Sequence, residues 1–257
     1  MVTRFHIGAK QLESGIAAYA KRFDLLEVRL AATSTGGSAG VPSARRPIDA
    51  PSQGISTFRR WRKQVPPHFD FTVVVGPGAS RLRTGKELDA DVAWAKEVAD
   101  ALQARCVLVA TPPDVTPTAL WRDRLAALVE RLKREATIVV WEPSGIWEVP
   151  EAARVAQRLG ITLAVDAARE VLPPGPIAYA RLRAMGETRS FGIAALERIV
   201  RNIGPRRDAF VVLETDGALA ECKRLRQIAA RRPGKGEGGL GRVVRPRAIR
   251  VKDDEQE

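Results

Sequence analysis

The chain has 257 residues, 45% of them hydrophobic, which is enough for the core of one α/β barrel of about 250 residues. Its formal net charge is +12, and no apolar run reaches the roughly 18 residues of a membrane span. The first ten residues lack the apolar core of a signal peptide, so we predict a cytoplasmic protein. The two cysteines, Cys106 and Cys222, lie in apolar or helical patterns, which predicts buried thiols without a disulfide or a metal cluster.

Eight short apolar segments, rich in β-branched residues, recur along the chain. This composition is typical of strands that are buried on both faces of a parallel sheet. The predicted strands are residues 4–9, 25–30, 69–75, 106–110, 137–142, 161–166, 177–183 and 209–215.

Helical patterns separate most of these strands, and capping residues predict where the helices begin and end. The signals, in chain order, are a cap at Ser56, a start at Thr116–Pro117 with an end near Arg134, a helix from Pro150 to Gly160, and a helix capped by Ser190 and closed by Gly204. The helix predicted after the sixth strand is the weakest, because the helical pattern ends early in the segment AREVLPPG.

Eight strand–helix units predict a TIM-type (β/α)8 barrel over residues 1–231. A doubly wound open sheet is the alternative, but it favours a glycine-rich loop after strand one, and IGAKQLESG does not match G-x-G-x-x-G. Residues 33–54 are rich in Gly, Ser and Pro and are predicted to form a flexible insertion. Residues 232–257 are predicted to be a disordered tail.

Charged side chains stand near the carboxyl ends of the strands, which meet at one mouth in a barrel of this type. They are Glu27, Arg29, Glu142, Asp166, Arg181, Arg183 and Glu214, with Thr111 beside them. Arginines bind phosphate or carboxylate through two hydrogen bonds, and carboxylates act as acids and bases or hold a hard divalent ion. We therefore predict a binding site for a phosphate- or sugar-like anion, with Glu27 and Glu142 as catalytic candidates if the protein is an enzyme.

An alternative to this site stays open. The arginines and carboxylates could simply neutralise each other at the rim of an inactive barrel. Trp147 follows a Pro-Ser-Gly turn and could stack over a ligand or cover the core.

The only histidines, His6 and His68, are predicted to lie apart, which argues against an imidazole metal site and a Ser-His-Asp triad. No cofactor is predicted.

The end of the chain is strongly basic. Residues 223–252 contain eleven Lys or Arg and one acid, and the last five residues carry four acids. Such a segment favours salt-sensitive, sequence-independent contact with nucleic acid, although an anionic membrane surface or solubility alone explains it too. The candidate nucleic-acid contacts are Arg231, Arg232, Arg242, Arg245, Arg247 and Arg250.

Four stretches resemble the YecE-like family, domain of unknown function 72, over about residues 5–231. They are TFRRWRKQVPPHFDF (57–71), LLEVR (25–29), WEPSGIW (141–147) and YARLR (179–183). The resemblance implies an irregular TIM-type barrel and names no reaction. The residues that keep the family pattern are Glu27, Glu142, Trp147, Tyr179 and Arg181.

Other polar positions depart from that pattern, which identifies the chain as a divergent member. The polar segment that follows Glu27 in the family is replaced here by the Gly/Ser-rich stretch. The basic pair after Glu142 reads Pro143-Ser144, and a histidine of strand seven reads Arg183. Tyr179 joins the predicted substrate-binding residues, and the oligomeric state stays open.

Overall fold

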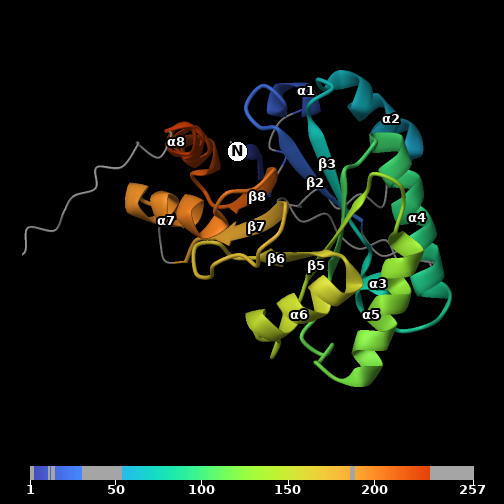
Figure 1. Cartoon of the computed structure of the whole chain (residues 1–257). Coiled ribbons are helices and arrows are strands. Elements are labelled where there is room, and N and C mark those ends of the chain that lie inside the picture. The colour runs from blue at the N-terminus through green and yellow to red at the C-terminus, as the bar shows by residue number, and fades with distance from the viewer. Residues whose placement is uncertain (1–2, 11, 13–14, 31–53, 186–188, 232–257) are drawn as a thin grey trace, which may run out of the picture.

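Eight parallel strands form one sheet in the order β1-β8-β7-β6-β5-β4-β3-β2, so the predicted TIM-type barrel is confirmed (Figure 1). The computed structural model describes residues 3–10, 12, 15–30, 54–185 and 189–231. Of the predicted insertion only Gly54 falls within these ranges, and residues 232–257 lie outside them. The strands are β1 (Arg4–Ala9), β2 (Leu25–Arg29), β3 (Asp70–Val74), β4 (Cys106–Ala110), β5 (Ile138–Glu142), β6 (Thr162–Val165), β7 (Ile177–Arg183) and β8 (Asp208–Glu214).

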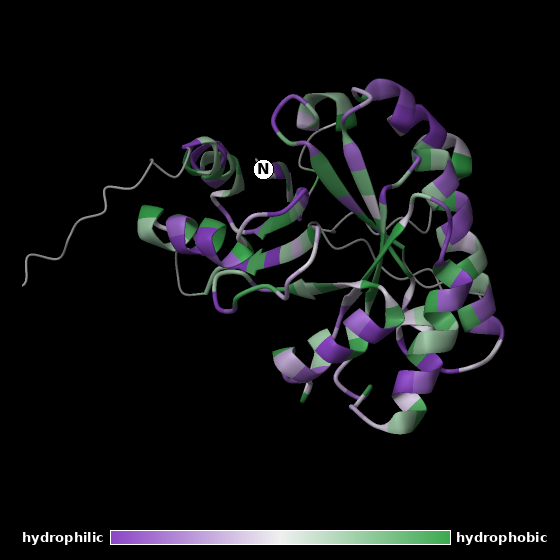
Figure 2. Cartoon of the chain, viewed as in Figure 1, coloured by the Kyte–Doolittle hydropathy of each residue, from purple (hydrophilic) through white to green (hydrophobic). Residues whose placement is uncertain are grey.

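Helices cover the outside of the sheet (Figure 1). They are α1 (Ile16–Tyr19), α2 (Ile55–Gln64), α3 (Pro77–Ser80), α4 (Lys86–Leu102), α5 (Ala119–Leu132), α6 (Val149–Leu159), α7 (Ile193–Ile203) and α8 (Ala218–Ala230). Most show hydrophilic and hydrophobic residues in alternation, as expected for helices with one buried face (Figure 2). No helix in the described part of the chain is both long and apolar enough to cross a membrane.

Three of the predicted helix starts are wrong, and packing explains two of them. Gly54 caps α2, because Ile55 packs against the core and brings the start of the helix upstream of Ser56. Gly192 caps α7, because Phe191 packs on the core and its N–H is held by the carboxylate of Glu221, which keeps the chain after Ser190 extended.

The third wrong start is that of α5, which begins after Thr118, because the N–H of Thr118 closes a turn on the carbonyl of Thr116 at 2.8 Å. The predicted helix ends at Gly160 and Gly204 are confirmed. Both glycines have a positive φ, of 66° and 67°, which favours glycine over other residues.

Alternate residues of each strand point into the barrel and fill it with apolar side chains. The interior cluster comprises Leu25, Val74, Cys106, Leu108, Val140, Ala164, Tyr179, Phe210 and Val212. The residues between them pack outward against the helices, as the period of two in a strand requires. Cys106 and Cys222 are both free and buried, as predicted. The same parity carries Glu27, Glu142, Arg181 and Glu214 to the inner side of their strand ends.

The barrel is nearly closed where β1 meets β2. The Tyr19 hydroxyl joins the two strands, because it accepts the N–H of Ala9 at 2.8 Å and lies 2.9 Å from the carbonyl of Leu25. Gly8 makes this approach possible, since a Cβ at that position would lie 2.2 Å from the Leu25 carbonyl oxygen. The N–H of Asp24 also bonds to the Ile7 carbonyl at 2.9 Å. Backbone contacts therefore bring together the two ends of the sheet.

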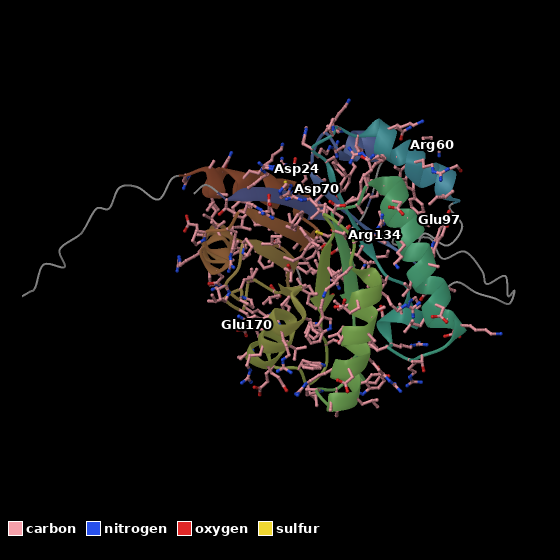
Figure 3. All side chains as sticks on the ribbon, turned by 45° about the vertical axis from the view of Figure 1, so that its right-hand side comes forward. Asp24, Arg60, Asp70, Glu97, Arg134 and Glu170 are labelled. Atoms are coloured by element: carbon pink, nitrogen blue, oxygen red, sulfur yellow. The ribbon has the colours of Figure 1, made fainter. Side chains whose placement is uncertain are left out.

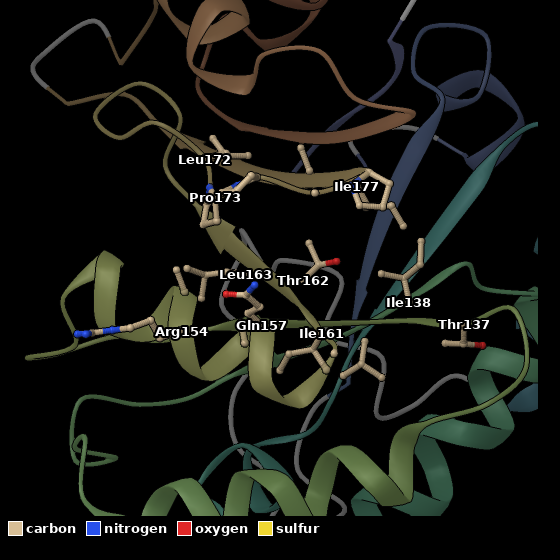
Figure 4. Close-up of a pocket in the computed structure, with 18 of the residues that line it drawn as sticks. Thr137, Ile138, Arg154, Gln157, Ile161, Thr162, Leu163, Leu172, Pro173 and Ile177 are labelled. Carbon is tan, nitrogen blue, oxygen red and sulfur yellow. The ribbon is translucent and has the colours of Figure 1, made fainter. Parts of the chain in front are cut away.

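The connection between β6 and β7 has no helix, so the weak helix predicted after the sixth strand is wrong. Arg206 holds this segment instead, by donating to the carbonyls of Leu172, Gly175 and Ile203 at 2.8 to 3.1 Å. The two strands pair only from Ala164 onward, so their first residues diverge. An apolar groove of about 480 Å³ opens there between α6 and the connection (Figure 4).

Ionic side chains close the barrel at the amino ends of the strands. His6 lies between two carboxylates, 2.5 Å from Asp70 and 3.2 Å from Asp208, and stacks on Phe210. Arg105 completes the group at 2.6 Å from Asp208. Asp70 lies beside Asp24 at the start of the neighbouring strands β3 and β2, and its N–H donates to the Asp24 carbonyl (Figure 3). His68 is exposed in the turn before β3 and is not part of this group.

Candidate functional site

The carboxyl ends of four strands bring three glutamates and two arginines together at the mouth of the barrel. Glu27 comes from β2, Glu142 from β5, Arg181 and Arg183 from β7, and Glu214 from β8. We call these five residues, with Arg29 and Lys10, the mouth cluster. Because inward positions alternate along each strand, these side chains all stand above the apolar layer of the interior.

Arg181 is the centre of the mouth cluster. Its guanidinium lies 3.1 Å from Glu27 and 2.9 Å from Glu214, and it also donates to Glu142. Arg181 is only 2% exposed, so its charge is balanced by these carboxylates rather than by water. One buried cation thus holds three strand ends in place.

The other cations of the mouth cluster lie nearer to solvent. Arg183 bridges Glu142, at 2.6 Å, and Glu214, at 3.4 Å, while its side chain stays 49% exposed. Lys10 lies 2.9 Å from Glu214, and Arg29 lies 3.6 Å from Glu27. The acids and Arg181 are therefore buried, and the other three cations form the outer surface. Four cations face three acids, a formal excess of one positive charge.

Glu27 lies at the bottom of the mouth cluster and accepts a hydrogen bond from the Tyr179 hydroxyl at 2.7 Å. Burial raises its pKa above the usual value, against the lowering effects of Arg29 and of the Tyr179 hydrogen bond. The residue is 4% exposed and is enclosed by Tyr179 and Arg181. The geometry brings this catalytic candidate into the cluster but away from its open side.

Glu142 lies closer to the surface and is held by both Arg181 and Arg183. Burial raises its pKa, and the charge and hydrogen bond of Arg183 are the main influences that lower it. Burial also lowers the pKa of Arg183, but the charges of Glu142 and Glu214 outweigh this and raise it. The protonation of Glu142 therefore depends on where Arg183 points.

A hollow of about 520 Å³ adjoins the mouth cluster, between β1, β8 and the start of α8. Arg183 and Glu214 form its border with the cluster, and Lys10 stands at the end of β1. Its charged lining residues are Lys10, Arg22, Arg183, Arg189, Glu214 and Asp216. Four cations and two acids give this lining a formal charge of +2, which favours a negatively charged occupant.

Three predicted site residues lie beside the mouth cluster rather than in it. Asp166 pairs with Arg169 at 3.6 Å and caps the N–H of Ala168. Trp147 donates to the Val115 carbonyl at 2.6 Å and packs edge-on against Trp141, so it covers the core.

Thr111, the third, accepts the Trp141 indole N–H at 3.1 Å and thereby ties the end of β4 to β5.

Sequence reasoning missed Lys10, Arg22, Arg189 and Asp216, four charged residues that line the hollow. Lys10 could have been found, since it follows the last residue of β1 directly.

The basic tail gives no second site in the described residues. Arg231 is exposed at the end of α8, and Arg232, Arg242, Arg245, Arg247 and Arg250 lie outside the described ranges. Within those ranges, no group of three His, Cys, Asp or Glu side chains has an arrangement that could hold a metal ion.

The nearly closed ring of parallel strands, the filled interior and the polar strand ends define a TIM-type barrel with a charged mouth. The chain belongs to the protein family of unknown function DUF72, whose sequence profile matches residues 52–235, so the resemblance to this family is confirmed. Three of the four motifs lie in the matched range, and LLEVR (25–29) lies outside it. No curated protein matches it in sequence.

Several solved structures share this fold. A DUF72 family protein from Enterococcus faecalis has 12% identity and a TM-score of 0.63, over 89% of this chain and 95% of that one. A DUF72 family protein from Thermotoga maritima has 14% identity and a TM-score of 0.61, over 88% and 98%. A structure of an L-ribulose 3-epimerase has 14% identity and a TM-score of 0.55, over 88% and 93%. At such identities the likeness concerns the fold alone.

Proposed function

We propose that this barrel binds a small anionic molecule, phosphate-like or sugar-like, in the hollow beside the mouth cluster. The single observation that carries the proposal is the separation of charges at the mouth. The carboxylates are buried and bonded to arginines, whereas Lys10 and Arg183 remain partly exposed on the lining of the hollow. The lining as a whole carries four cations and two acids, so an anion entering the hollow meets a net positive charge.

The size of the hollow supports a small ligand. Its volume of about 520 Å³ falls in the range of small-molecule sites, roughly 300 to 1,000 Å³. Arg183 offers a planar fork of N–H donors, which suits phosphate and carboxylate groups. Arg22 and Arg189 add two exposed cations without an ion-pair partner in the described parts of the chain. Together these groups favour an anionic ligand over a neutral one.

Two other functions make different predictions. An inactive barrel whose charges only neutralise each other would bind no anion at the mouth. A nucleic-acid-binding protein acting through its tail would bind anions when the hollow is altered and lose binding when residues 232–257 are removed. The paired charges of the mouth cluster fit an inactive barrel, but Arg22 and Arg189, which have no ion-pair partner in the described ranges, favour the hollow. Residues 232–257 of the tail lie outside those ranges.

Thermal unfolding in the presence of sulfate tests the proposal. A ligand at 100 times its dissociation constant stabilises the folded state by about 2.7 kcal/mol, or roughly 5 to 10 °C for a chain of this size. Sulfate also stabilises proteins through exclusion from their surface, so the informative quantity is the difference between variants at equal ionic strength. Arg183→Gln removes a cation of the hollow, and Arg131→Gln removes an exposed cation that pairs with Asp89 on the helices.

The proposal predicts that Arg183→Gln loses most of the sulfate-dependent shift and that Arg131→Gln keeps it. Equal shifts in the wild type and both variants would reject the hollow as the site. A shift that disappears only when residues 232–257 are removed would move the anion site to the tail.

A further inference from the structure

Arg183 stands between the hollow and a buried carboxylate. On one side its guanidinium lies 2.6 Å from Glu142, and on the other the residue lines the hollow. Glu142 does not line the hollow itself. An anion in the hollow and Glu142 therefore compete for the same guanidinium.

The charges around Glu142 make this competition costly for the carboxylate. It faces Arg181 and Arg183 from β7, and it is near two further acids, Glu27 from β2 and Glu214 from β8. The remaining cations, Lys10 and Arg29, lie closest to Glu214 and Glu27 and belong to those acids. If Arg183 turns to a ligand, Arg181 alone must balance Glu142 while it also holds two other carboxylates.

A buried carboxylate that loses a partner either keeps a costly charge or takes up a proton. Arg183 contributes both a charge and a hydrogen bond that lower the pKa of Glu142, so its departure leaves Arg181 alone against burial and the neighbouring acids, which raise the pKa. The cheaper outcome in a site of this kind is protonation. Glu142 would then be a neutral acid that still accepts a hydrogen bond from Arg181.

We infer that anion binding in the hollow draws Arg183 away from Glu142 and that the mouth cluster takes up a proton in exchange. This inference rests on the proposed function and adds to it a coupling between ligand and pH. The proton comes from solvent and ends on the Glu142 carboxylate. Because binding and proton uptake are linked, the anion binds more tightly as the pH falls, by up to tenfold per pH unit when a full proton is taken up.

Calorimetric titration of the full chain with sulfate tests the coupling, since sulfate has no group that titrates near neutral pH. The titration is done at one pH in two buffers with different heats of ionisation, and the difference in observed heat counts the protons exchanged. The same pair of titrations is made with Glu142→Gln, which keeps the shape of the side chain without its charge. Glu151→Gln is the matched control, because Glu151 pairs with Arg122 on the outer helices.

We expect proton uptake in the wild type and in Glu151→Gln, and its loss in Glu142→Gln. We also expect Glu142→Gln to bind sulfate more tightly at neutral pH, because no carboxylate competes for Arg183. Binding with the same heat in both buffers would overturn the coupling and leave the anion site intact. Absence of binding by the wild type would overturn the proposed function, and the coupling with it.

Discussion

Replacing Arg181 should destabilise the protein more than any other single charge change at the mouth. Arg181→Met keeps much of the volume but removes a cation that is 2% exposed and contacts Glu27, Glu142 and Glu214. Removing one partner of a buried ion pair costs about 3 to 5 kcal/mol, because the other charge is left buried. Here three carboxylates lose a partner, and Arg29, Lys10 and Arg183 compensate only in part, so we place the loss at about that range.

Urea unfolding at pH 7 measures this loss, with Arg134→Met as the control. Arg134 pairs with Asp100 on the helical surface, where such pairs contribute about 0 to 1 kcal/mol. The loss in Arg181→Met should shrink toward pH 4.5, because protonation relieves the buried carboxylates. If Arg181→Met unfolds at the same urea concentration as Arg134→Met, the mouth cluster does not hold the strand ends together and the reasoning is refuted.

Burial raises the pKa of Glu27, so its contribution to stability is fully present below the unfolded value of 4.5 and decreases as the pH rises through the folded pKa. Glu27→Gln should therefore gain stability relative to the wild type as the pH rises from 4.5. If urea unfolding gives the same difference in free energy of unfolding between the two proteins at every pH, this prediction is contradicted. Burial also raises the pKa of Asp208, but hydrogen bonds from His6 and Arg207 and the charge of Arg105 outweigh it and lower the pKa. Asp208→Asn should accordingly lose about 1.5 to 3 kcal/mol at neutral pH, and the loss should fade as the pH drops below 3.8, which acid unfolding curves can test. Gly8→Ala should lower stability by about 1 to 3 kcal/mol, because its Cβ would meet the Leu25 carbonyl, whereas Gly15→Ala, with open space around it, should be neutral or slightly stabilising. Similar melting temperatures for the two glycine variants would disprove the close contact at the β1–β2 seam.

The strands could be predicted from sequence because burial on both faces leaves a simple local signal. Apolar, β-branched runs such as CVLVA and IAYARLR coincide with β4 and β7. The helix starts could not be predicted equally well. Ser56 and Ser190 have the chemistry of caps, but the packing of Ile55 and Phe191 against the core decides where α2 and α7 begin.

Six of the seven members of the mouth cluster followed from topology, since parallel strands end at one face, and only Lys10 was missed. Which of these residues contact one another could not be predicted, because the contacts depend on the tilt and stagger of the strands. Nothing local indicates that Arg181 contacts three glutamates from three strands, or that Glu27 is enclosed beneath it. Trp147 illustrates the same limit, because the Pro-Ser-Gly turn before it directs the ring to Trp141 rather than to the cluster.

The ionic group at the amino ends of the strands could not be predicted from the sequence, for a related reason. His6, Asp70, Arg105 and Asp208 come from four separate segments, and only the register of β1, β3, β4 and β8 brings them together. A lone histidine in a strand carries no local sign of such partners. The hollow beside the mouth is similar, because Arg22 and Arg189 precede a strand and a helix that lie far apart in the sequence.

The location of a bound anion tests the central claim most directly. Crystals grown without sulfate or phosphate would be soaked in selenate, and data collected at the selenium absorption edge would locate the ion by its anomalous signal. The account predicts a selenium peak in the hollow, within hydrogen-bonding distance of the Arg183 guanidinium and beside Lys10. Selenate bound at other basic sites of the same crystals, with none in the hollow, would contradict it.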